Sequence, residues 1–342
     1  MTSRDAAIRW LSDEYYEQNG EQFDVLENPP SGLEFSRLVH ISRPVLIKGS
    51  RIPASTLWSD EYLIDSMGSR AISIAVTPNG LADAVTRGPD GRLYFVEPHV
   101  EKMTMAEFLS TISSGSASGS SDVCYLQSQN GNLYSSNDFE EGRGSESEFE
   151  PLRRDVPSDI PWCTEALGKS PDAVNLWIGD SRSTTSIHSD PYENVYTVVR
   201  GAKYFTLLPP TEGWCLNERT YPHATYTRCP STSRLTLVPS TGTDEIRWSS
   251  VANPHIPGVL PRGAHPIHVT VLAGQSLYLP PGWWHHVRQS GGTTIALNWW
   301  YDTEMRGMSW VTLSFLRGIG EVPPGNDSVE EDAKQSQVII TS

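Results

Sequence analysis

The chain has 342 residues and a formal net charge of −15, because 26 lysines and arginines stand against 41 aspartates and glutamates. This acidic balance argues against nucleic acid or an anionic membrane as the main partner, since both would repel it. The four cysteines have no Cys-x-x-Cys spacing, which argues against a structural zinc site and a disulfide scaffold.

The N-terminal segment predicts a helix rather than a signal peptide. Charges interrupt its first apolar run, and no later run approaches the ~18 apolar residues of a membrane span. Apolar side chains recur along one face from Arg4 to Asn19, and Gly20 ends the pattern. We therefore expect an intracellular protein, cytoplasmic or also nuclear, that begins with this helix.

A capping box marks the next predicted helix. Thr104 and Glu107 have the spacing at which each side chain bonds the other's backbone N–H, so a helix should run from Thr104 to about Ile112. We expect three polar segments without regular structure: a Ser-rich loop over 113–121, an acidic insertion over 135–150 and a disordered tail over 321–342.

Short β-like runs dominate the rest of the chain and predict a mainly β fold. Several are joined by Gly-containing turns, and few helices separate them, as in a jelly-roll or cupin-like barrel, the double-stranded β-helix, with surrounding helices. The predicted strands are Ala71–Val76, Asp122–Gln127, Ala173–Ile178, Val195–Arg200, Lys203–Leu208, His268–Leu272, Ser276–Leu279, His286–Gln289 and Thr294–Trp299.

These elements suggest an N-terminal region (1–120) packed on a barrel (121–303), followed by a C-terminal helix (304–320) and the tail. The helix pattern at Met308–Ile319 is rich in large apolar residues. Such a helix either packs on the barrel or pairs with its copy in a second chain, which would give a homodimer.

The motif His188-Ser-Asp190 and the distant His285 form the candidate metal site. Side chains alternate along a strand, so His188 and Asp190 should point to the same face. Two imidazoles and one carboxylate occupy one face of an Fe(II) octahedron and leave the other open. His286 is the competing ligand but should face the opposite way. The alternative is that His188 is a surface residue and the Trp-Trp-His-His segment belongs to an aromatic core.

A second group of polar residues could anchor an acidic cosubstrate. Lys203 heads an apolar strand, where a lysine either reaches solvent or points into the barrel. Inside the barrel, its ammonium could bind the 5-carboxylate of a dicarboxylic keto acid. Thr185 and Tyr125 are candidate partners of that carboxylate, and Asn194 and Asn298 are candidate donors to the 1-carboxylate. Each polar residue alone is also compatible with a structural role.

Several segments together resemble the small JmjC-domain, cupin-type protein hydroxylases over roughly residues 20–318. Within this family the resemblance is strongest to the JmjC-domain protein seven type of lysyl hydroxylase, which acts on developmentally regulated GTP-binding proteins. The segments are Arg43–Gly49, Ile74–Val85, Asp172–Gly179, Ser186–Tyr196, Gly201–Phe205, Leu208–Pro210, Gly274–Val287 and Ala296–Tyr301.

The resemblance implies an enzyme that uses Fe(II), O₂ and 2-oxoglutarate to hydroxylate a lysine carbon of a protein substrate. The family's iron ligands fall on His188, Asp190 and His285, and an aromatic residue near the metal falls on Trp300. The family's 2-oxoglutarate contacts fall on Tyr125, Thr185, Asn194, Lys203 and Asn298.

Three other functions remain open. They are N-methyl-lysine demethylation by the same chemistry, a non-catalytic cupin-type binding module, and a zinc-dependent sugar-phosphate isomerase, although no basic phosphate-binding cluster is evident. The insertion over 210–267, with Trp214, Tyr226 and Trp248, is expected to line the substrate groove because it returns the chain between the two halves of the metal site.

Overall fold

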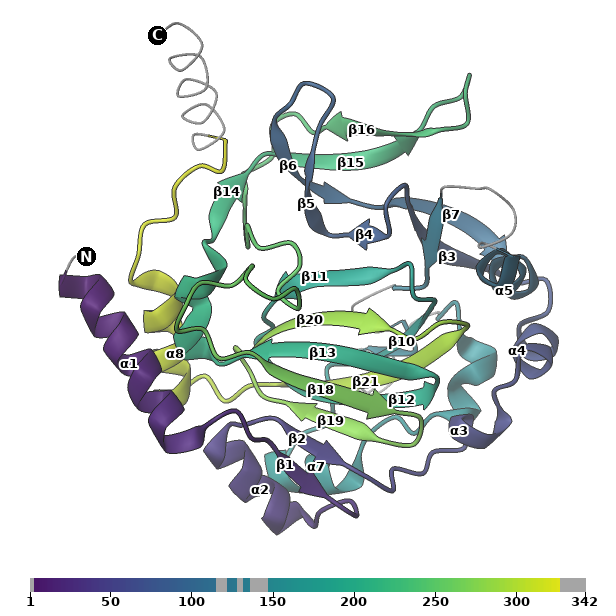
Figure 1. Ribbon diagram of the computed structural model, residues 1–342. Helices are drawn as coiled ribbons and strands as arrows, with labels where there is room; N and C mark the ends of the chain where they lie inside the picture. Colours follow the sequence, from purple (N-terminus) through teal and green to yellow (C-terminus); the bar gives the residue numbers. More distant parts are fainter. Residues whose placement is uncertain (1–2, 115–121, 128–131, 136–146, 327–342) are drawn as a thin grey trace, which may run out of the picture.

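Two facing sheets lie at the centre of the protein (Figure 1). The computed structural model describes residues 3–114, 122–127, 132–135 and 147–326. One sheet has seven strands in the order β1-β2-β19-β12-β21-β10-β9, and the other has five in the order β18-β13-β20-β11-β4. The mainly β, double-stranded β-helix fold predicted from the sequence is confirmed.

Eight antiparallel strands make up the barrel, four in each sheet. The chain changes sheet at nearly every turn, as in a jelly roll. The strands of the seven-stranded sheet are β10 (Ala173–Gly179), β12 (Tyr192–Arg200), β19 (Ser276–Leu279) and β21 (Thr294–Asp302). Those of the five-stranded sheet are β11 (Thr184–His188), β13 (Ala202–Leu208), β18 (Ile267–Leu272) and β20 (Trp284–Gln289).

The seven-stranded sheet is covered on both faces, which explains its long apolar runs. Every residue of β10 and all but the last of β21 are buried. One face packs into the barrel, and the other packs on the helices of the N-terminal half, where Leu297 and Trp299 join Phe35 and Phe108 in the largest core cluster. Strands buried on both faces are continuous rather than alternating in hydrophobicity.

Helices surround the barrel and several begin with a side-chain cap. The first predicted helix is confirmed, and so is the second, in which Thr104 and Glu107 form the expected capping box. The helices are α1 (Ser3–Asn19), α2 (Gly32–Ile41), α3 (Ala54–Leu57), α4 (Asp60–Met67), α5 (Met105–Ser114), α7 (Pro161–Leu167) and α8 (Met308–Gly318), with 3-10 turns η1 (Glu150–Asp155) and η2 (Pro210–Leu216).

The N-terminal half also adds strands to both barrel sheets. β2 (Val45–Ile47) pairs with β19 on one side and with β1 (Asp24–Leu26) on the other. β4 (Leu81–Ala82) pairs in parallel with β11. The remaining strands are β3 (Ala71–Thr77), β5 (Ala84–Arg87), β6 (Leu93–Glu97), β7 (His99–Thr104), β8 (Val123–Tyr125), β9 (Tyr134–Ser135), β14 (Arg219–Tyr221), β15 (His223–Arg228), β16 (Leu235–Pro239) and β17 (Ile246–Trp248).

The insertion over 210–267 contains more regular structure than expected. It holds η2 and four strands, and β15 pairs in parallel with β6 from the N-terminal half. These strands are short: β14 pairs with β17 and β15 with β16 inside the insertion, and among the described strands only β15 has a partner strand far away in the sequence. Only Trp248 of its three predicted groove residues lines the pocket of the metal site described below. Trp214 lines a second hollow of about 550 Å³, and Tyr226 packs against Tyr94.

Helices α1 and α8 lie on the same side of the barrel, where Arg4 donates a hydrogen bond to the Ile319 carbonyl (Figure 1). No residue of α8 is buried, and Phe315 is 57% exposed. The predicted tail is not disordered at its start, since Asn326 exchanges hydrogen bonds with the backbone of Leu93. Residues 327–342, most of the Ser-rich loop (115–121) and most of the acidic insertion (136–146) lie outside the described residues.

Across the described part of the chain, none of the helices combines the length and apolar character needed to span a membrane.

Candidate metal centre

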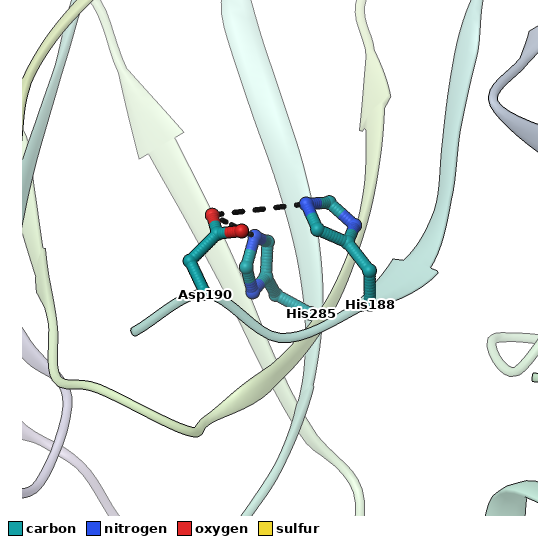
Figure 2. Close-up of side chains that lie close together, drawn as sticks. All are labelled: His188, Asp190 and His285. Carbon is teal, nitrogen blue, oxygen red and sulfur yellow. Dashed lines mark ion pairs between the residues drawn. The ribbon is translucent and has the colours of Figure 1, made fainter. Parts of the chain in front are cut away.

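Three side chains from two neighbouring strands meet at one end of the barrel. His188 is the last residue of β11, Asp190 follows it in the turn, and His285 on β20 is the cross-strand partner of His188. The Asp190 Oδ2 lies 3.8 Å from the His188 Nε2 and 3.6 Å from the His285 Nε2. Figure 2 shows all three side chains pointing toward one another, and their ligand atoms lie within 4.8 Å.

Backbone hydrogen bonds hold both imidazoles in the tautomer that a metal requires. The His188 Nδ1 lies 2.8 Å from the Ser186 carbonyl oxygen, and the His285 Nδ1 lies 3.0 Å from the Trp283 carbonyl oxygen. A carbonyl only accepts, so each Nδ1 carries the proton and each Nε2 presents a lone pair toward Asp190. Neutral imidazoles and a carboxylate are the donor set of non-haem Fe(II) sites.

Burial keeps His285 neutral. The residue is 5% exposed, and burial together with the nearby His188 lowers the pKa of His285 to about 4. His286 faces away from this site, as alternation predicts. Its ring is fully buried and stacks on His255, with 5.1 Å between the ring centroids. His286 is therefore not one of the three converging ligands.

The triad lies in a pocket of about 410 Å³ between the two sheets. Its lining is mostly aromatic and polar, with no lysine or arginine among the described residues that form its wall. The lining residues are Asp83, Phe95, Glu97, Tyr125, Gln127, Trp177, Thr185, Ser186, His188, Ser189, Asp190, Asn194, Tyr196, Phe205, Trp248, Leu279, His285, Val287, Asn298 and Trp300.

A buried ammonium lies beside this pocket. Lys203 is 1% exposed, and its Nζ donates a hydrogen bond to the Tyr125 hydroxyl at 3.2 Å. Tyr125 and Thr185 also share a side-chain hydrogen bond. Burial lowers the pKa of Lys203 to about 7 and raises that of Tyr125. Within the described ranges no aspartate or glutamate pairs with Lys203, so this cation lacks the anion that such burial normally requires.

The two predicted asparagines form a chain of hydrogen bonds on neighbouring strands. The Asn298 amide donates to the Asn194 Oδ1 at 3.2 Å, and the Trp177 indole donates to the Asn298 Oδ1 at 2.7 Å. Trp300 lines the pocket and stacks on Tyr192, with 5.0 Å between centroids. All nine residues proposed from the sequence therefore lie around one pocket: eight line it, and the ninth, Lys203, donates a hydrogen bond to one of these eight, Tyr125.

Sequence reasoning missed several pocket residues. The sequence could have identified Trp177, because the alternation of side chains along the predicted Ala173–Ile178 strand places it on the same face as Asn175. Asp83, Phe95 and Glu97 reach the pocket only because β4 and β6 pair with strands far away in sequence. No local pattern identifies such residues.

Residues 31–307 match the Cupin-like domain family. The chain is also 38% identical over 317 residues to "Lysine-specific demethylase JMJ32" of Arabidopsis thaliana, with 88% of this chain and 87% of the relative covered. The chain is a cupin-like JmjC-domain protein.

Two further relatives cover most of the cupin-like JmjC chain. Human "Bifunctional peptidase and (3S)-lysyl hydroxylase JMJD7" is 37% identical over 82% of this chain and 84% of its own length. "JmjC domain-containing protein E" of Dictyostelium discoideum is 32% identical, over 84% and 86%. The family implies Fe(II) and 2-oxoglutarate, and the donor set of the triad and the unpaired Lys203 ammonium fit both groups.

Proposed function

We propose that this protein is an Fe(II)- and 2-oxoglutarate-dependent dioxygenase that hydroxylates a carbon of a lysine side chain in a protein substrate. The observation that carries the proposal is the buried Lys203 ammonium, which bonds the wall residue Tyr125 of the pocket that contains the His188, Asp190 and His285 triad. A zinc isomerase or an inert binding module has no need for a buried cation aimed at an acidic cosubstrate, so these alternatives account for the pocket less well.

The polar side chains proposed from the sequence each have a role in this reaction. His188, Asp190 and His285 would hold Fe(II), and Lys203, Tyr125 and Thr185 would hold the 5-carboxylate of 2-oxoglutarate. Bound Fe(II) and 2-oxoglutarate supply the oxidising chemistry, in which O₂ gives one oxygen atom to succinate, with loss of CO₂, and the other to a substrate C–H bond.

Two asparagines and the aromatic side chains of the pocket wall would position the 1-carboxylate and the substrate. Asn194 and Asn298 would orient the 1-carboxylate, because their amides are already aligned by the bond from the Trp177 indole. The aromatic side chains of the wall, Trp300 included, would exclude water and hold the reacting carbon in place.

The names of the relatives support a lysine of a protein as the substrate, but they indicate two different reactions. The human relative is named as a lysyl hydroxylase and the Arabidopsis relative as a lysine demethylase. We favour hydroxylation of a developmentally regulated GTP-binding protein, on the strength of the sequence motifs described above. Demethylation of an N-methyl-lysine is the second candidate, because the same site could oxidise an N-methyl carbon.

Peptide turnover distinguishes these reactions. The protein, supplied with Fe(II), ascorbate and 2-oxoglutarate, is expected to form succinate faster when lysine-centred peptides from developmentally regulated GTP-binding proteins are added. Mass spectrometry should show a lysine product heavier by one oxygen atom. Loss of a methyl group from N-methyl-lysine peptides, without oxygen addition to unmodified ones, would instead establish demethylation. Absence of both products, while 2-oxoglutarate binds, would contradict the enzyme assignment.

The affinity for 2-oxoglutarate should depend on pH. The pKa of Lys203 is lowered to about 7 in the free protein, and the bound 5-carboxylate needs the charged ammonium. Binding should therefore weaken by about 10-fold between pH 6 and pH 8, as the ammonium loses its proton. Calorimetric titration of the Mn(II)-loaded protein measures this. A pH-independent affinity would show that Lys203 does not bind the carboxylate.

A further inference from the structure

The outer part of the metal pocket carries two carboxylates that the proposed reaction has not used. The wall contains three acidic residues, and Asp190 belongs to the metal triad. The other two, Asp83 and Glu97, lie close enough for the charge of Glu97 to raise the pKa of Asp83. With no lysine or arginine among the described wall residues, this region has an excess of negative charge.

Asp83 is held beside the metal site by β11, the strand that ends in His188. It directly follows β4, which pairs with β11, and the Ser186 hydroxyl donates to the Asp83 carbonyl oxygen at 2.6 Å. The backbone of Asp83 is in the left-handed region, with φ of 51°. This conformation turns the chain from β4 into β5 at the pocket edge.

The Asp83 carboxylate lacks a cation of its own. The Gln127 amide donates to its Oδ2 at 3.0 Å. No lysine or arginine in the described part of the chain forms an ion pair with it, and burial raises the pKa of Asp83, while His188 opposes this shift. A partly buried carboxylate of this kind is stabilised when a cation binds beside it.

Glu97 presents the second carboxylate from the end of β6. Its side chain is 52% exposed, and its Oε2 lies 3.4 Å from the Nε2 of His223. His223 itself is tied to the Ser240 hydroxyl through its Nδ1, 2.7 Å away. Glu97 therefore contacts one imidazole and still borders the pocket with an accessible carboxylate.

Two aromatic rings of the pocket wall pack in series next to His188. Trp248 stacks on His188, with 6.0 Å between centroids and 10° between planes, and it packs against Phe95 at 4.7 Å. The Trp248 indole also donates to the Ser186 hydroxyl at 3.2 Å. The rings offer an apolar surface that is suited to a methylene chain, in the same pocket as the two carboxylates.

We propose that Asp83 and Glu97 bind the ammonium group of the substrate lysine, with Phe95 and Trp248 beside its methylene chain. The inference rests on the proposed function, for which it names the residues that select lysine. When a side-chain carbon of lysine is hydroxylated, the ammonium group is several bonds away from the reacting C–H bond. The carboxylates that bind the ammonium should therefore be different residues from the metal ligands. Asp83 and Glu97 satisfy this requirement, since neither belongs to the triad.

A binding experiment without O₂ tests this site. Two random peptide libraries, identical except for lysine or uncharged norleucine at the central position, are passed over immobilised protein loaded with Mn(II) and 2-oxoglutarate. We expect at least about 10-fold preference for the lysine library, because the ammonium forms charge-assisted hydrogen bonds. Asp83→Asn should remove most of this preference, and Glu97→Gln, at a half-exposed position, should reduce it about 3-fold.

Asp65→Asn is the matched control, since it makes the same change of charge at an exposed position on α4. Equal retention of the two libraries by the unchanged protein, including no retention of either, would overturn the inference. So would an unaltered preference in both variants, or a parallel loss of 2-oxoglutarate affinity as large as the loss of preference. A lysine preference that depends on Asp83 without a hydroxylated product would count against the proposed function alone, whereas hydroxylated lysine without any preference would count against this site alone.

Discussion

Replacement of His188 with alanine is expected to lower the affinity for Fe(II) by at least about 100-fold and to abolish peptide-dependent succinate formation. Loss of a residue that only hydrogen-bonds a metal ligand lowers the metal affinity by about 10–100-fold, and His188 would bind the metal directly. Its Nε2 is one of only three donor atoms that converge within 4.8 Å in the described residues. Anaerobic titration with Fe(II), or with Co(II) followed by its visible absorption, measures the change.

His40→Ala is the control for this prediction, because His40 is an exposed histidine in the last turn of α2, away from the pocket. The control should bind metal as the unchanged protein does. Equal metal affinity in the His188→Ala variant would contradict the assignment of the triad. A fall in the unfolding temperature of the metal-free variant would indicate that His188 supports the fold instead.

The barrel and the three converging side chains of the candidate metal centre were predictable from the sequence because local patterns indicate both. Buried strands leave continuous apolar runs such as Thr294–Trp299, and these occur as strands in the structure. The alternation of side chains along an extended segment places His188 and Asp190 on one face and separates His285 from His286. In the structure β11 ends at His188 and Asp190 lies just beyond the strand, yet their side chains converge, and His286 stacks on His255 away from the triad.

The outer part of the pocket was not predictable, because it depends on pairing between distant segments. Asp83 reaches the site through the parallel pairing of β4 with β11, and the two strands are about 100 residues apart in the sequence. Glu97 depends on β6, which pairs with β15 of the insertion over 210–267. A charged residue at the end of a short strand has no local feature that distinguishes a pocket position from a solvated one.

Replacement of Lys203 with methionine is expected to have opposite effects on stability and on ligand binding. The metal-free protein should become more stable by roughly 2–4 kcal/mol near pH 7, since burial lowers the pKa of Lys203 from 10.5 to about 7 and each pKa unit is worth 1.36 kcal/mol. The folded state binds the proton less readily than the unfolded state. The cost of the lysine is therefore fully present below pH 7 and disappears as the pH rises toward about 10. Denaturant unfolding at several pH values measures the difference between variant and unchanged protein.

The same substitution should weaken 2-oxoglutarate binding on the order of 100-fold or more, because the 5-carboxylate would be buried without its cation. The analogue 2-oxopentanoate has the same 1-carboxylate and 2-oxo group but no 5-carboxylate, so its weaker binding should be nearly unchanged in the Lys203→Met variant. Lys48→Met, at a partly exposed position paired with Glu27, is the control and should alter neither ligand. A loss of both ligands in the Lys203→Met variant would indicate damage to the whole pocket. Selective loss of 2-oxoglutarate, together with a gain in stability, would show that the buried ammonium is maintained for the cosubstrate at the expense of the fold.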